Sequence, residues 1–162
     1  MAYAFSKYLK IPKRTALSSI RSSILPARMQ LISKSPKIMI DSAHNPVSIS
    51  ALCREIRIFP HKKLIVLFGA MKDKNYPKEL KTLSKISHIL ICTQVSTPRS
   101  ESHKILQKEA KKHFPCAVSF KNPKKALFFA KKIANKNDLI LITGSIYLIG
   151  EIFGKEKRII PM

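Results

Sequence analysis

The sequence is poor in glycine, cysteine and acidic residues. It has four glycines in 162 residues and no Gly-x-x-x-x-Gly-Lys-Ser/Thr run, the backbone cradle that binds nucleotide phosphates. The three cysteines, Cys53, Cys92 and Cys116, are isolated and set in apolar surroundings, which predicts reduced core thiols rather than disulfides or a metal site. No apolar run approaches the roughly 20 residues that span a bilayer, and residues 1–14 lack a secretory apolar region. We therefore expect a cytoplasmic domain without a membrane segment.

Acidic side chains are few enough to leave a formal charge of +22, from 31 Lys and Arg against 9 Asp and Glu. Such a charge is typical of nucleic-acid binders. Lysine outnumbers arginine, however, and most phenylalanines lie within apolar stretches, so few aromatics are placed to stack on bases. The pattern favours lysine-rich solvent faces. Non-specific attraction of polyanions, and steering of acidic substrates, remain expected consequences.

Unbroken apolar runs alternate with amphipathic stretches along most of the chain. The runs predict strands at 29–32, 37–41, 64–69, 88–93, 117–120 and 139–143. The amphipathic stretches predict helices at 3–10, 13–23, 47–59, 77–86, 100–114, 123–135 and 145–153. Strands that are apolar throughout belong to a parallel sheet covered on both faces. The sequence therefore predicts an α/β fold, a three-layer sandwich with a Rossmann-like, mostly parallel sheet and helices on both faces.

Four polar segments each begin where a predicted strand ends. These segments are 41–45, 69–74, 93–99 and 143–147. Because the carboxyl ends of parallel strands lie at one edge of a sheet, we expect the segments to meet there and form a ligand site. The Thr-Gly-Ser turn at 143–145 would present backbone N–H groups and a hydroxyl to an anion.

The same residues have structural interpretations. Asp41 could cap the turn, and Asn45 could be the N-cap of a helix that starts at Pro46. Ser145 could be another N-cap, and Arg28 a surface charge. No Ser-His-Asp set, Cys-His set or metal-binding histidine spacing is evident, so we expect neither a self-contained hydrolase nor a metal site in this chain.

Three ordered motifs resemble the C-terminal domain of folylpolyglutamate synthase/dihydrofolate synthase, a branch of the Mur ligase family. They are Asp-Ser-Ala-His-Asn-Pro at 41–46, Phe-Gly-Ala-Met-Lys-Asp-Lys at 68–74 and Thr-Gly-Ser-Ile-Tyr-Leu-Ile-Gly-Glu at 143–151. Residues 25–30, Leu-Pro-Ala-Arg-Met-Gln, resemble the linker motif of that family. Ser42 replaces a common glycine and Asn75 a usual aspartate. The resemblance extends from about residue 3 to the end.

The resemblance implies an ATP-dependent ligase that adds L-glutamate to folate or dihydropteroate through an acyl phosphate. By matching positions, Arg28 and Asp41 would contact ATP, while His44 and Ser145 would act as catalytic residues in glutamate placement and turnover. A guanidinium suits phosphate oxygens and a carboxylate suits ribose hydroxyls. A basic, donor-rich rim would suit a dicarboxylate substrate. The candidate rim residues are Asn45, Lys72, Arg99 and Tyr147.

The resemblance also implies a division of the chain. Residues 1–24 would be closing helices of a central ATPase domain, 25–35 a linker and first strand, and 36–162 the glutamate ligase domain. Apolar residues near the start (Tyr3, Phe5, Tyr8 and Leu9) predict a buried helix face, which would pack on that central domain.

The phosphate loop and Mg²⁺ ligands of the family belong to the central domain. We therefore expect this chain alone to be a poor ligase that needs the missing part in cis or in trans, as a fragment or one half of a split gene. The alternatives are a non-catalytic basic Rossmann-like binding module or a remnant protein.

Overall fold

A six-stranded sheet forms the centre of the chain in a computed structural model that describes residues 2–22 and 25–154. The strands are β1 (Gln30–Lys34), β2 (Lys37–Ile40), β3 (Leu64–Phe68), β4 (Ile89–Thr93), β5 (Val118–Phe120) and β6 (Leu139–Thr143). Their order is β1-β2-β6-β3-β4-β5, and β1 alone among these strands runs antiparallel to its neighbour. The mostly parallel sheet confirms the predicted fold class.

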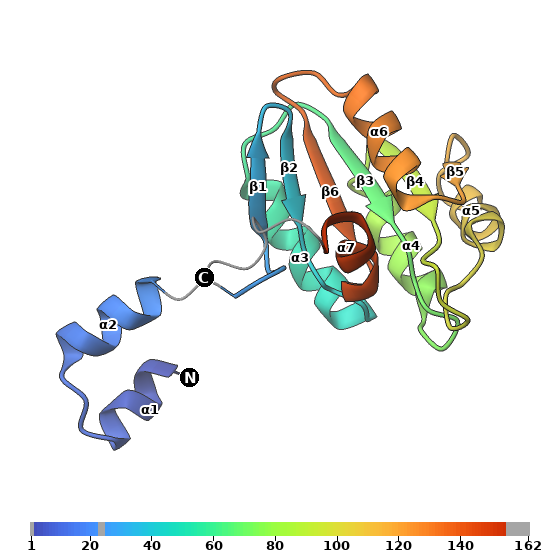
Figure 1. Cartoon of the computed structure of the whole chain (residues 1–162). Helices are drawn as coiled ribbons and strands as arrows, with labels where there is room; N and C mark the ends of the chain where they lie inside the picture. Colours follow the sequence, from blue (N-terminus) through green and yellow to red (C-terminus); the bar gives the residue numbers. More distant parts are fainter. Residues whose placement is uncertain (1, 23–24, 155–162) are drawn as a thin grey trace.

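Helices cover both faces of this sheet. They are α3 (Pro46–Ile58), α4 (Tyr76–Ser84), α5 (His103–Lys111), α6 (Pro123–Ile133) and α7 (Ile146–Phe153), preceded by α1 (Ala2–Tyr8) and α2 (Lys13–Ser22). Figure 1 shows α3, α4 and α5 behind the sheet and α6 and α7 in front of it. Because both faces are covered, β3 and β6 are buried along their whole length, as their apolar sequences predict.

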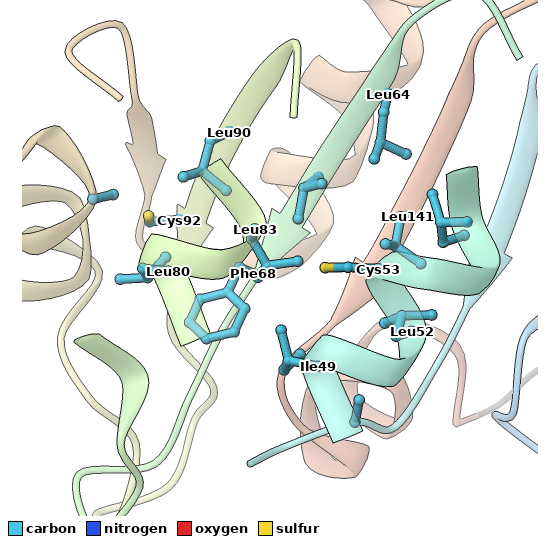
Figure 2. Packing of buried hydrophobic residues seen from close by; sticks show 14 of the residues in the cluster. Ile49, Leu52, Cys53, Leu64, Phe68, Leu80, Leu83, Leu90, Cys92 and Leu141 are labelled. Atoms are coloured by element: carbon cyan, nitrogen blue, oxygen red, sulfur yellow. The ribbon is translucent and has the colours of Figure 1, made fainter. Parts of the chain in front are cut away.

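The larger apolar layer lies between the sheet and helices α3, α4 and α5. Figure 2 shows Phe68 of β3 beside Leu80 and Leu83 of α4, with Cys53 of α3 nearby. Burial raises the pKa of the Cys53 thiol to about 11. It raises that of Cys92 to about 12. Both are therefore protonated core thiols, as predicted.

The prediction that Cys116 is a core thiol is wrong, because its side chain is exposed. Cys116 lies in the turn between α5 and β5, and β5 begins two residues later at Val118. The apolar residue Ala117 beside it is buried instead.

Helix α5 begins at His103 and not at residue 100 as predicted. The Ser100 hydroxyl accepts the Val95 N–H at 2.9 Å, and the Glu101 N–H donates to the Ala70 carbonyl at 2.9 Å. These bonds hold residues 100 and 101 against neighbouring loops, so Ser102 becomes the N-cap of the helix.

The predicted apolar face of α1 is exposed within this chain. Phe5 is 62% and Tyr8 81% exposed, and their rings stack on each other with centroids 6.2 Å apart. Helices α1 and α2 pack together to one side of the sheet (Figure 1), so nothing in the described chain buries this face. Burial of this face against a central domain, which the resemblance implies, stays a prediction. No helix of the described ranges is long and apolar enough to cross a membrane.

Candidate functional site

The polar segments that follow the strands meet at one edge of the sheet, as predicted. The Gly144 N–H donates to the Ala43 carbonyl at 2.9 Å, which joins the segments after β6 and β2. The Gly69 N–H donates to the Thr143 carbonyl at 3.3 Å, and the Lys72 N–H to the Arg99 carbonyl at 2.9 Å. The segments after β2, β6, β3 and β4 thus form one continuous rim.

A pocket of about 140 Å³ lies in this rim. Its lining residues are His44, Met71, Lys74, Arg99, Gly144, Ser145, Ile146 and Tyr147. The structure therefore brings together four of the residues predicted from sequence, namely His44, Arg99, Ser145 and Tyr147.

Gly144 determines the shape of the turn that leads into α7 and so places Ser145 and Tyr147. Its φ of +101° belongs to the region that favours glycine. A Cβ atom there would lie 2.5 Å from the Gly69 carbonyl oxygen and 2.6 Å from Phe68 Cε2. The turn can therefore close against β3 because residue 144 has no side chain.

Ser145 is the N-cap of α7, so its structural interpretation is confirmed. Its hydroxyl oxygen accepts the Tyr147 N–H at 3.2 Å, and the residue is 3% exposed. The hydroxyl proton is free to donate elsewhere, because the cap uses only an oxygen lone pair. A serine in this position can therefore donate to a ligand in the pocket while it caps the helix.

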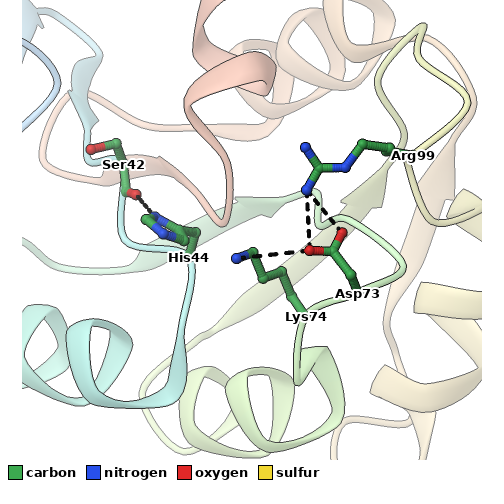
Figure 3. Close-up of polar contacts among 5 residues, drawn as sticks. All are labelled: Ser42, His44, Asp73, Lys74 and Arg99. Atoms are coloured by element: carbon green, nitrogen blue, oxygen red, sulfur yellow. Dashed lines mark hydrogen bonds and ion pairs between the residues drawn. The ribbon is translucent and has the colours of Figure 1, made fainter.

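The charges at the pocket form a chain of three side chains, shown in Figure 3. The Arg99 guanidinium donates to both carboxylate oxygens of Asp73 at 3.1 Å, and the Lys74 ammonium lies 3.9 Å from the same carboxylate. The hydrogen bond from Arg99 lowers the pKa of Asp73. Two cations face one carboxylate, so the rim keeps a positive charge that suits an anionic ligand.

His44 lies beside Lys74 at the rim (Figure 3). Its Nδ1 is 2.9 Å from the Ser42 carbonyl oxygen. A carbonyl oxygen can only accept, so we assign the proton to Nδ1 and leave Nε2 as an acceptor. The imidazole is therefore oriented to accept a proton at Nε2.

Asp41 has a structural role. Its 5% exposed carboxylate accepts the Met29 N–H at 2.9 Å and the Ala43 N–H at 2.8 Å. These bonds tie the linker to the end of β2, together with a bond from the Ser42 N–H to the Ala27 carbonyl at 2.8 Å. The structure thus places the exposed Arg28 beside Asp41, and both lie outside the lining of the pocket.

We expect Asp41→Asn to lower the free energy of unfolding by about 1–2 kcal/mol. An amide group can satisfy only one of the two backbone N–H groups, and an unpaired buried donor is costly. Urea unfolding of the whole chain measures this, with Glu55→Gln, at an exposed position of α3, as the control. Equal midpoints for Asp41→Asn and the wild type would show that the carboxylate does not hold the linker.

The other predicted rim residues lie outside the pocket. Asn45 is the N-cap of α3, where its side chain accepts the Ser48 N–H at 2.9 Å. Lys72 is exposed, and it is Lys74 that lines the pocket. Both lysines flank Asp73 in one loop, and only the fold of that loop decides which side chain turns inward.

Glu79, in the first turn of α4, was not predicted as a site residue. It is fully buried, and within the described ranges neither carboxylate oxygen has a hydrogen-bond partner. Burial raises the pKa of Glu79 to about 7, against a smaller opposing effect of Lys74. Its spacing in the sequence could have indicated that it is buried. Glu79 lies on the same helical face as Tyr76, Leu80 and Leu83.

Metal ligands are not clustered at this edge. Among residues 2–22 and 25–154, no group of three or more His, Cys, Asp and Glu could hold a metal ion. The residues of these ranges thus do not fit a metal ion.

Comparisons with known proteins agree with this architecture. The family model described as "Mur ligase, glutamate ligase domain" matches residues 27–146. The dihydrofolate synthase/folylpolyglutamate synthase of Buchnera aphidicola (subsp. Schizaphis graminum) is 29% identical over 161 residues, 98% of this chain and 38% of that protein. The Bacillus subtilis protein of the same name is 28% identical over 140 residues, 83% of this chain and 31% of that one.

Solved structures show the same fold. Escherichia coli FolC in complex with DHPP and ADP superimposes with a TM-score of 0.81 at 25% identity, covering 87% of this chain and 33% of that one. The folylpolyglutamate synthase of Mycobacterium tuberculosis complexed with ADP gives a TM-score of 0.83 at 19% identity, covering 90% of this chain and 36% of the other. This chain spans about a third of the length of these relatives.

Proposed function

Since the chain belongs to the Mur ligase family as its glutamate ligase domain, we propose that its edge pocket binds L-glutamate for ligation to folate or dihydropteroate. The observation that carries this proposal is the meeting of Lys74, Arg99, His44 and Ser145 around one small pocket. Among solved structures with this fold, one bifunctional folylpolyglutamate synthase/dihydrofolate synthase has Mn, AMPPNP and L-glutamate bound.

Size and charge support an amino acid as the ligand. The pocket measures about 140 Å³, well below the roughly 300–1,000 Å³ of sites for drug-sized ligands. Arg99 and Lys74 can each hold a carboxylate, Arg99 through a planar pair of donors. The exposed Tyr147 at the rim adds a phenolic donor.

The chain's own residues have defined parts in the proposed reaction. The glutamate amine must lose a proton to attack, and His44 Nε2 accepts that proton. The amine lone pair then attacks the acyl phosphate carbon and forms the C–N bond, the C–O bond to phosphate breaks, and the phosphate leaves carrying the second proton of the amine. Ser145 donates a hydrogen bond that keeps the amino acid in place, and Lys74 and Arg99 hold its carboxylates. ATP supplies the phosphoryl group that activates the accepting carboxylate.

Nucleotide contact is proposed for Arg28 and Asp41. Arg28 is exposed next to the edge and offers donors to phosphate. Each Asp41 oxygen already accepts one backbone N–H, and one lone pair on each remains for a hydroxyl. The ATPase portion and magnesium site are proposed to come from the remaining two thirds of a complete family member, in cis or in trans.

We expect the chain alone to bind L-glutamate with a dissociation constant in the millimolar range. We expect it to form the amide product only after the ATPase portion of a relative, ATP and Mg²⁺ have been added. Calorimetry measures binding, and mass spectrometry detects the product.

Lys74→Met should weaken L-glutamate binding about tenfold, because it removes the roughly 1.4 kcal/mol that one charge-assisted hydrogen bond contributes. The exposed Lys78→Met on α4 should bind like the wild type.

Two results would contradict the proposal. One is equal L-glutamate affinity in Lys74→Met and the wild type. The other is tight, salt-sensitive binding to RNA with no response to L-glutamate, which would favour the basic binding module.

A further inference from the structure

The pocket lysine has a buried carboxylate behind it. We propose that Glu79 is a positioning residue for Lys74, and that protonation of Glu79 controls how much of the Lys74 charge is available to a carboxylate ligand. The identity of that ligand, L-glutamate, rests on the proposed function. The relation between Glu79 and Lys74 does not.

The first observation is that Glu79 is buried without a partner. Buried carboxylates are ordinarily paired or hydrogen-bonded. Glu79 is 0% exposed, and no described residue donates to Oε1 or Oε2. Ionising a buried carboxyl group without a partner costs free energy. The group is therefore stable in the protonated form, or in the ionised form when a cation lies near it.

The second observation is the direction of the side chain. Helical side chains lean toward the N-terminus of their helix. Glu79 lies one turn into α4, whose N-cap is Asn75, so its carboxylate is directed toward loop 69–75. That loop carries Lys74, whose side chain is one-third exposed and lines the pocket. Lys74 therefore belongs both to the loop toward which Glu79 is directed and to the lining of the pocket.

The charge of Lys74 supports this arrangement. Titratable groups on the surrounding elements include Asp73 and Lys74 in the loop, Tyr76 on α4, Cys53 on α3, and Glu101, Glu109 and Lys112 within and at the two ends of α5. Of these, Lys74 is the one whose charge lowers the pKa of Glu79, while burial raises it to about 7. The α5 charges act instead on the Tyr76 hydroxyl.

These observations set the direction of the effect. When Glu79 is protonated, the Lys74 charge faces the pocket and Asp73 alone. When Glu79 ionises, it neutralises part of that charge, and an anionic ligand binds less tightly. By linkage, a bound carboxylate near Lys74 must in turn favour the protonated form of Glu79.

A carboxyl titration tests the pair without any ligand. Side-chain ¹³C NMR of the full chain should give Glu79 a midpoint near 7. Lys74→Met should raise this midpoint by about one pH unit, because a nearby cation stabilises the carboxylate. Lys78→Met should leave it unchanged. A Glu79 midpoint near 4.5, or one that Lys74→Met does not move, would overturn the inference.

The effect on the ligand is tested with Glu79→Gln, which keeps the shape and removes the charge. L-Glutamate affinity should be equal in Glu79→Gln and the wild type at pH 6 and about fivefold tighter in the variant at pH 8. Both proteins contain His44, so its contribution to binding cancels in the comparison. Equal affinities at both pH values would overturn the proposed control of the pocket. If neither protein binds L-glutamate, the proposed function fails, and the carboxyl titration alone decides the Glu79–Lys74 relation.

Discussion

Replacing Gly144 by alanine should lower the free energy of unfolding by about 3 kcal/mol or more and abolish L-glutamate binding. The positive φ at this turn costs an alanine about 1–2 kcal/mol. The new methyl group would also meet the Gly69 carbonyl and the Phe68 ring at 2.5 and 2.6 Å, and overpacking of this kind costs about 1–3 kcal/mol. The contact is relieved only if the turn moves away from β3. This movement takes Ser145 and Tyr147 out of the pocket.

Gly150 provides the matched control. It lies inside α7, and a Cβ atom there has no neighbour within 4 Å. Gly150→Ala should therefore raise the free energy of unfolding by about 0.5–1 kcal/mol, because alanine loses less entropy in a helix. Chemical denaturation of both variants measures the difference. A Gly144→Ala protein as stable as the wild type would show that the turn does not depend on a missing side chain.

Replacing Glu79 by glutamine should stabilise the chain at pH 8 by about 2–3 kcal/mol. Burial raises the pKa of Glu79 from 4.5 to about 7, so the folded chain holds this proton more tightly than the unfolded chain. The stability linked to the proton is complete below pH 4.5 and is lost as pH rises through about 7. Each pKa unit corresponds to about 1.4 kcal/mol. Above pH 7 the wild type buries an unpaired charge that glutamine avoids.

The comparison needs two pH values. At pH 4.5 the two proteins should differ by less than about 0.5 kcal/mol, because the carboxyl is largely protonated in the folded chain and half protonated in the unfolded one. Glu55→Gln, at an exposed position of α3, is the control and should follow the wild type at both values. A Glu79→Gln protein that is less stable than the wild type at pH 8 would contradict the absence of a partner for the carboxylate.

Much of the fold follows from local sequence. The apolar runs of β3 and β6 predict buried parallel strands, and Asn45 followed by Pro46 predicts the start of α3. The predicted start of α5 was wrong by three residues, because Ser100 bonds to Val95 in the preceding loop and Glu101 bonds to Ala70, which is distant in sequence. Such tertiary bonds override helical periodicity and leave no local signal.

The site was predictable in outline and not in detail. The meeting of the polar segments follows from the parallel strands, whose carboxyl ends share one edge. Which of Lys72 and Lys74 faces the pocket depends on how loop 69–75 folds against Arg99. The carboxylate of Asp41 holds the linker through a bond to Met29, and that bond exists only in the folded chain. The direction of side chains within loops could therefore not be predicted from the sequence.

We propose above all that the edge pocket takes the amino acid that is to be ligated. An NMR titration of the full chain with L-glutamate tests it most directly, with L-glutamine as the ligand that lacks the side-chain carboxylate. We predict saturable shifts confined to the backbone of residues 144–147 and to the side chains of His44, Lys74 and Arg99, with clearly weaker binding of L-glutamine. Shifts centred elsewhere, or equal binding of the two amino acids, would contradict the claim.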